Sequence, residues 1–185
     1  MSEPRRRILI PGDRKQAAPS AAGDASLPVE ACDCPRLDPA DWDGVESDWS
    51  DITFLRASVK ALAGVPVGFD AARSALFERA SALGFEVPED AMLLIGEGTF
   101  SRPLLLEVEG EVPASKEVIR PGGVAYSRLV EAPWGELAKA ARRLRDEARE
   151  RYGRPPAAMY AWYLTCPVCS RERNFETLLV AHYPG

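Results

Sequence analysis

Apolar positions downstream of residue 52 follow two periods, one helical and one extended. Residues 52–66 carry spaced apolar side chains and predict an extended segment. After Asp70, a candidate N-cap, apolar residues recur at helical spacing, namely Ala72, Leu76, Ala80 and Leu83, before Gly84. A second helix is predicted to start at Pro133 and stop at Gly153, with one apolar face formed by Leu137, Ala141, Leu144, Ala148 and Tyr152.

Short apolar runs predict the strands. They cover residues 92–95, 103–112, 118–119, 124–130, 158–165 and 175–183. The order strand, helix, strand, strand therefore occurs twice, over residues 52–112 and 113–185. This pattern predicts an α+β fold in which duplicated β-α-β-β units form one antiparallel sheet with two helices on one face. The opposite face would be concave and open to a ligand.

The N-terminal third has a different composition. Residues 1–30 are rich in small, polar and charged residues without periodicity, and we expect a disordered tail. Residues 31–51 contain few aliphatic residues, and we expect an irregular but ordered strap that precedes a single domain over residues 52–185. Large aromatic side chains are favoured in buried positions, so Trp42 and Trp49 of the strap should pack on that domain.

Charge and hydropathy exclude two classes of partner. The net charge of −5 provides no electrostatic footprint for nucleic acid. The apolar run at residues 8–10 is too short for a signal sequence or a membrane span, so no membrane partner is expected. We therefore expect a cytoplasmic protein, a monomer or a homodimer, in a reducing compartment where lasting disulfides are rare.

Two cysteine pairs stand at opposite ends of the domain, Cys32 with Cys34 and Cys166 with Cys169. Four thiolates suit tetrahedral zinc, and an all-cysteine set is a common structural site. The pairs therefore predict a zinc ion that joins the strap to the last hairpin, with His182, the single histidine, as an alternative to Cys32. A disulfide or buried thiols without a metal are the alternatives.

The second half of the chain resembles the GyrI-like small-molecule-binding family. The similar segment is Val118-Ile119-Arg120-Pro121-Gly122-Gly123-Val124-Ala125-Tyr126, followed by Pro133-Trp134. Both ends also resemble a bacterial subgroup labelled as uncharacterised proteins or hydrolases, through Cys34-Pro35-Arg36-Leu37-Asp38-Pro39 and Tyr163-Leu164-Thr165-Cys166-Pro167-Val168-Cys169. The subgroup has two adjacent cysteines where this chain has Cys32-Asp33-Cys34. The resemblance implies a pocket for hydrophobic, often cationic compounds, and some relatives hydrolyse reactive cyclopropane-bearing compounds.

Strand alternation and this resemblance together supply candidate site residues. Alternation places Tyr160 and Trp162 on one face, where aromatic walls and carboxylates would suit a flat organic cation. The candidate ligand-binding residues are Tyr126, Trp134, Tyr160, Trp162, Glu107 and Glu176. The candidate water-activating carboxylates are Glu176, Glu107 and Glu97. Glu107 and Glu109 would equally suit the wet face of an open sheet, and Glu97 could belong to a turn.

These observations favour a GyrI-like protein that binds a small hydrophobic or cationic molecule and contains a structural zinc site. A hydrolase that opens a reactive xenobiotic through a glutamate-activated water is the first alternative. A soft-metal or redox sensor that works through its cysteines is the second.

Overall fold

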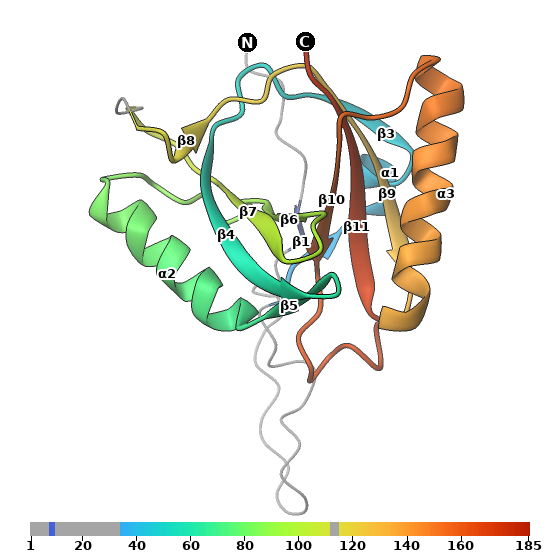
Figure 1. Ribbon diagram of the computed structural model, residues 1–185, viewed down its shortest axis with the longest axis horizontal. Coiled ribbons are helices and arrows are strands. Elements are labelled where there is room, and N and C mark those ends of the chain that lie inside the picture. Colours follow the sequence, from blue (N-terminus) through green and yellow to red (C-terminus); the bar gives the residue numbers. More distant parts are fainter. Residues whose placement is uncertain (1–7, 10–33, 112–114) are drawn as a thin grey trace, which may run out of the picture.

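The body of the protein is a curled antiparallel sheet, seen in the computed structural model, which describes residues 8–9, 34–111 and 115–185 (Figure 1). Within these residues the sheet has nine strands, in the order β3-β9-β11-β10-β6-β7-β4-β5, with β8 paired to β4. Their bounds are β3 (Val45–Asp48), β4 (Phe54–Leu62), β5 (Val65–Val67), β6 (Leu93–Gly96), β7 (Ser101–Glu107), β8 (Val118–Ile119), β9 (Val124–Glu131), β10 (Ala158–Tyr163) and β11 (Glu176–Tyr183). The predicted α+β class and antiparallel sheet are confirmed, whereas duplication of one unit stays a prediction.

The two predicted long helices are α2 (Phe69–Ala82) and α3 (Trp134–Tyr152). Helix α2 begins at Phe69, so the cap is Gly68 and not Asp70. Gly153 ends α3 in the left-handed conformation, with φ of 68°, which glycine adopts without a steric penalty. None of the helices in the described residues combines the length and the apolar composition needed to cross a membrane.

The segment 52–66, expected to be one extended stretch, is a hairpin. Strand β4 turns at Ala63 and Gly64, whose φ angles are 50° and 83°, and β5 returns along the edge of the sheet. The pattern of apolar residues continues across this turn, so periodicity alone does not reveal it.

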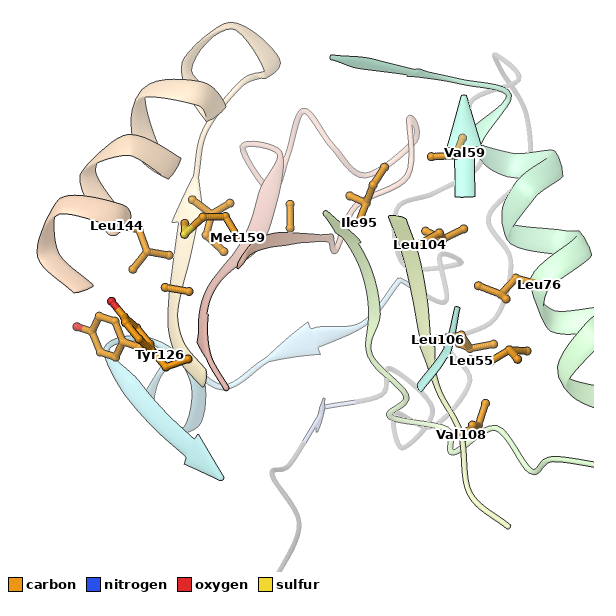
Figure 2. Close-up of a cluster of buried hydrophobic side chains, with 14 of the residues drawn as sticks. Leu55, Val59, Leu76, Ile95, Leu104, Leu106, Val108, Tyr126, Leu144 and Met159 are labelled. Carbon is orange, nitrogen blue, oxygen red and sulfur yellow. The ribbon is translucent and has the colours of Figure 1, made fainter. Parts of the chain in front are cut away.

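Both long helices cover the outer face of the curl, at opposite sides of the sheet (Figure 1). The first core cluster lies under them and combines helix residues with alternate strand residues (Figure 2). Its members include the aliphatic residues Leu55, Leu76, Ile95, Leu104, Leu106, Leu144 and Leu179 together with Met159. Leu104 and Leu106 belong to this cluster while Leu105 belongs to the other one, as the predicted alternation requires.

The opposite face of the sheet is filled, in contrast to the open concave cleft that the sequence predicts. A second core cluster covers it, in which Trp42 and Trp49 of the strap pack with Phe54, Trp162 and Leu178. The strap is also not irregular, because it contains β2 (Arg36–Leu37), α1 (Pro39–Trp42) and the sheet strand β3. Burial of the two tryptophans, to 3% and 1% exposure, is confirmed.

The first strand lies in the predicted tail. β1 (Ile8–Leu9) pairs antiparallel with β2 of the strap. The remainder of the tail, residues 1–7 and 10–33, lies outside the described residues and includes Cys32.

Replacing Ser127 with alanine should lower the free energy of unfolding by about 1 kcal/mol. The buried Ser127 hydroxyl lies 2.7 Å from the carbonyl oxygen of Trp42, to which it donates, and it thereby ties α1 to β9. For a chain of this size the melting temperature should fall by about 2–4 °C, measurable by calorimetry. Ser58→Ala, at an exposed position of β4, is the control and should leave the melting temperature unchanged.

Candidate functional site

Three cysteines from distant parts of the chain converge at one end of the second core cluster. The Sγ atoms of Cys34, Cys166 and Cys169 lie within 4.8 Å of one another. Those of Cys166 and Cys169 are 3.9 Å apart, and the backbone N–H of Cys166 donates to Cys34 Sγ at 3.2 Å. We call these residues the cysteine cluster.

Local turns present Cys166 and Cys169 together. The segment between β10 and β11 turns twice, through backbone hydrogen bonds from Ser170 to Cys166 and from Arg173 to Cys169, each 3.0 Å. Cys34 arrives from the strap just before β2, whose Leu37 is buried in the second core cluster. Packing of the strap on the sheet therefore places the Cys34 sulfur beside those of Cys166 and Cys169.

A buried arginine connects the two halves of the cluster. The Arg173 guanidinium donates to the carbonyl oxygens of Pro35 at 2.8 Å and of Leu164 at 3.1 Å, and lies 4.0 Å from Cys169 Sγ. Its Nε also donates to Glu176 at 2.7 Å, forming an ion pair with that carboxylate. One cation thus holds the backbone beside Cys34 and the backbone before Cys166.

The geometry of the cluster fits a metal better than a disulfide. A Zn–S distance of about 2.3 Å and tetrahedral angles require sulfurs about 3.8 Å apart, so only small movements would close these three around one ion. The 3.9 Å between Cys166 and Cys169 is nearly twice a disulfide bond length of about 2.05 Å. These three residues are therefore close enough to bind a metal ion.

The two candidates for a fourth ligand differ. Cys32 lies outside the described residues, so its role stays a prediction. His182 is not a member of the cluster: its Nε2 lies 2.8 Å from the carbonyl oxygen of Gly122, and its ring stacks on Trp49 with 5.0 Å between centroids.

A cleft of about 890 Å³, which we call the cysteine cleft, adjoins the cluster. Its lining includes Cys34 and Cys166 together with residues of α2. Its apolar walls include Phe69, Phe77, Val87, Leu93 and Trp162. Asp70, Arg73 and Glu89 add exposed charges. The volume lies within the range of about 300–1,000 Å³ typical of small-molecule sites.

A second cleft of about 450 Å³, which we call the helix cleft, lies between α3 and the outer face of the sheet. Its apolar walls include Leu137, Ala141, Met159, Ala161 and Leu179. Met159 and Ile95, which also borders it, lie between the two helix-covered parts of the first core cluster (Figure 2). Both clefts thus differ in position from the expected concave face.

The candidate aromatic residues separate into two groups. Tyr160 and Trp162 share the second core cluster, which confirms the predicted strand register, and they border the helix cleft and the cysteine cleft respectively. Tyr126 lies on the other face, in the first core cluster, and donates to Glu147 of α3 at 2.6 Å. Burial and the nearby Glu147 carboxylate raise the pKa of Tyr126. Trp134 is the first residue of α3, and its side chain lies outside the described part.

The three candidate carboxylates also occupy different environments. Glu107 accepts a hydrogen bond from the Met92 backbone N–H at 3.1 Å. Glu176 pairs with Arg173 at the cysteine cluster. Glu97 lines the helix cleft, and its two oxygens lie 2.7 and 2.6 Å from Nη2 of Arg145 on α3. Its turn is tight, because a Cβ at Gly98 would lie 1.9 Å from the Ser101 carbonyl oxygen.

Sequence reasoning missed two residues of these sites. Arg173 occurs in a charged segment, and only the folded chain brings its guanidinium to Pro35 and Leu164. Tyr163 packs against the first core cluster, on the helix-covered face of the sheet, yet it borders both clefts.

Comparisons with known proteins add one family. No curated protein matches the chain. The model of a family described as "Bacterial hydrolase" matches residues 24–181, which include the cysteine cluster and both clefts. Because this match covers most of the sequence, the chain belongs to that bacterial hydrolase family.

Proposed function

We propose that the protein is a hydrolase that acts on a small, mainly apolar molecule. One observation carries the proposal: two residues of the cysteine cluster line an apolar cleft of about 890 Å³. The family to which the chain belongs is described as a bacterial hydrolase family. The curled sheet with clefts of ligand size suits such binding. The relationship to GyrI-like proteins, which the similar text around Tyr126 suggests, is part of this proposal.

The metal in this proposal is zinc, held by Cys34, Cys166 and Cys169 with Cys32 as the fourth ligand. Support comes from the donor set, since soft thiolates favour zinc among the common cellular metals. With four cysteine ligands the ion would be structural and would cross-link the strap to the segment between β10 and β11. With a water in the fourth position, zinc would instead lower the pKa of that water.

The water-activating group in this proposal is Glu97. Of the three candidate carboxylates, Glu97 alone lines one of the two described clefts. A carboxylate at the edge of an apolar cleft can accept a proton from water as it attacks an electrophilic carbon. The Glu97 carboxylate forms an ion pair with Arg145 of α3 at 2.6 Å.

A binding protein without turnover is the second candidate function. The apolar walls of both clefts favour it, since they supply area for stacking and burial whether or not a reaction follows. The two candidates differ in one measurable respect, which is the release of product.

Replacing Glu97 with glutamine should lower kcat by about a hundredfold or more while ligand affinity is kept. The substitution retains the shape of the side chain and removes its ability to accept a proton. Turnover of a panel of p-nitrophenyl esters, aryl epoxides and lactones by the purified protein would provide the measurement.

Arg145→Gln is the matched control, because it breaks the same ion pair and leaves the carboxylate in place. It should retain most of the activity. If no compound of the panel is hydrolysed faster than in buffer, while the same compounds bind, the protein is a binder and the hydrolase proposal is wrong for these classes.

A further inference from the structure

The two clefts border the same residues. Val65, Pro66 and Tyr163 line both the cysteine cleft and the helix cleft. The first two belong to edge strand β5, and Tyr163 ends β10. The clefts are therefore neighbours that meet beneath the β4–β5 hairpin, and each has an apolar wall leading away from this junction.

We propose that the two clefts form one elongated binding site whose ligand is a long, mainly apolar molecule with a hydrogen-bond acceptor, such as a carbonyl oxygen, near its middle. Tyr163 is the residue that recognises the acceptor. This inference rests on the proposed function, since it names the chemical class of the substrate.

The polar group at the junction is held in a fixed position. The Tyr163 ring packs edge-on against Phe69, with 6.0 Å between centroids. Arg102 hydrogen-bonds to the Tyr163 side chain, and its guanidinium donates to the carbonyl oxygens of Gly96 at 2.6 Å and of Gly64 at 3.0 Å. These two backbone contacts fix the guanidinium, and the guanidinium in turn fixes the phenol.

The phenol is suited to donate to an acceptor. Burial raises the pKa of Tyr163, and the nearby Arg102 opposes this only in part, so the side chain is a neutral phenol at physiological pH. A hydroxyl whose oxygen accepts from a guanidinium is polarised and donates more strongly. A carbonyl at the junction would therefore be bound, and in a hydrolytic reaction its developing negative charge would be stabilised.

The walls on either side of Tyr163 match two apolar arms. Phe69, Phe77 and Leu93 line the arm beside α2, and Leu137, Ala141 and Met159 line the arm beside α3. Val65 borders both clefts and is 62% exposed. A ligand that spans the junction would cover it.

Two fluorescent ketones with one dimethylaminonaphthalene fluorophore test the proposal: prodan, with a short propionyl chain, and laurdan, with a long dodecanoyl chain. In both, the carbonyl lies between the ring and the chain, and its hydrogen bonding shifts the emission to longer wavelength. We expect one laurdan per chain, bound at least about tenfold more tightly than prodan because further methylene groups are buried.

Two filling variants distinguish one site from two. Ala71→Phe obstructs the cysteine cleft and Ala141→Phe the helix cleft. In a continuous site each variant weakens the same single laurdan. Two independent sites would instead bind two laurdan molecules, and each variant would abolish one and leave the other at full affinity, which would overturn the proposal.

Tyr163→Phe keeps the ring and removes the donor. The emission of bound laurdan should move to shorter wavelength and its affinity should fall by about threefold to tenfold. An unchanged emission maximum would overturn the role of Tyr163. All of these measurements report binding alone, so they are independent of turnover. Active protein with two laurdan sites refutes this inference only, and inactive protein with one spanning site refutes the hydrolase proposal only.

Discussion

Replacing Cys169 with serine should release the bound metal and lower the melting temperature by more than about 10 °C. Cys169 is the most deeply buried member of the cluster, at 1% exposure, and serine is a poor ligand for a soft metal. The cluster joins residues that are 132 positions apart, Cys34 and Cys166, so a bound ion closes a very long loop. Metal-binding free energy then contributes directly to folding free energy.

Val168→Ser is the control for this experiment. It places a serine in the same turn, at a position that is 43% exposed and contributes no ligand. Its metal content and melting temperature, measured by elemental analysis and calorimetry, should remain near those of the original chain. If Cys169→Ser melts at the original temperature and the metal stays bound, the cluster does not hold the stabilising metal ion that we propose.

Replacing Arg173 with methionine should lower the free energy of unfolding by about 3–5 kcal/mol. The Arg173 side chain is 6% exposed, so its removal leaves Glu176, which is 25% exposed, without this partner. The carbonyl oxygens of Pro35 and Leu164 each lose the hydrogen bond from Arg173. Urea denaturation provides the measurement. The same change should also weaken metal binding, because the guanidinium holds both halves of the cluster.

A double variant separates the ion pair from the backbone contacts. Arg173→Met with Glu176→Met removes both charges, and it should recover part of the lost stability because no unpaired charge remains. Arg173→Lys keeps the positive charge but loses the planar guanidinium with its several donors, so its stability should remain close to that of Arg173→Met. A single Arg173→Met that unfolds at the original urea concentration would contradict this account.

The elements that the sequence predicts correctly are those set by a local rule. The helical spacing around Leu76 and Leu144 recovers both long helices, and strand alternation places Tyr160 and Trp162 on the face away from them. The approach of Cys34 to Cys166 and Cys169 could also be predicted, because closely spaced cysteine pairs favour a shared site.

The features that the sequence does not predict depend on distant packing. Trp42 and Trp49 fill the face that was expected to bind a ligand. Trp42 ends the four-residue helix α1 and Trp49 directly follows β3, and segments this short have no periodicity to reveal their packing. The β4–β5 turn at Ala63 and Gly64 lies between the apolar residues Leu62 and Val65, so the apolar pattern alone does not mark it. The clefts form between elements, so the roles of Arg173 and Tyr163 emerge only in the folded chain.

X-ray absorption at the zinc edge, on protein purified without added metal, tests the central claim most directly. The account predicts one zinc per chain, surrounded by sulfur at about 2.3 Å, with four sulfurs if Cys32 completes the set. Three sulfurs and one lighter atom would place a water in the fourth position and make the ion part of the reactive site. Absence of stoichiometric metal, or a shell dominated by nitrogen and oxygen, would contradict the account.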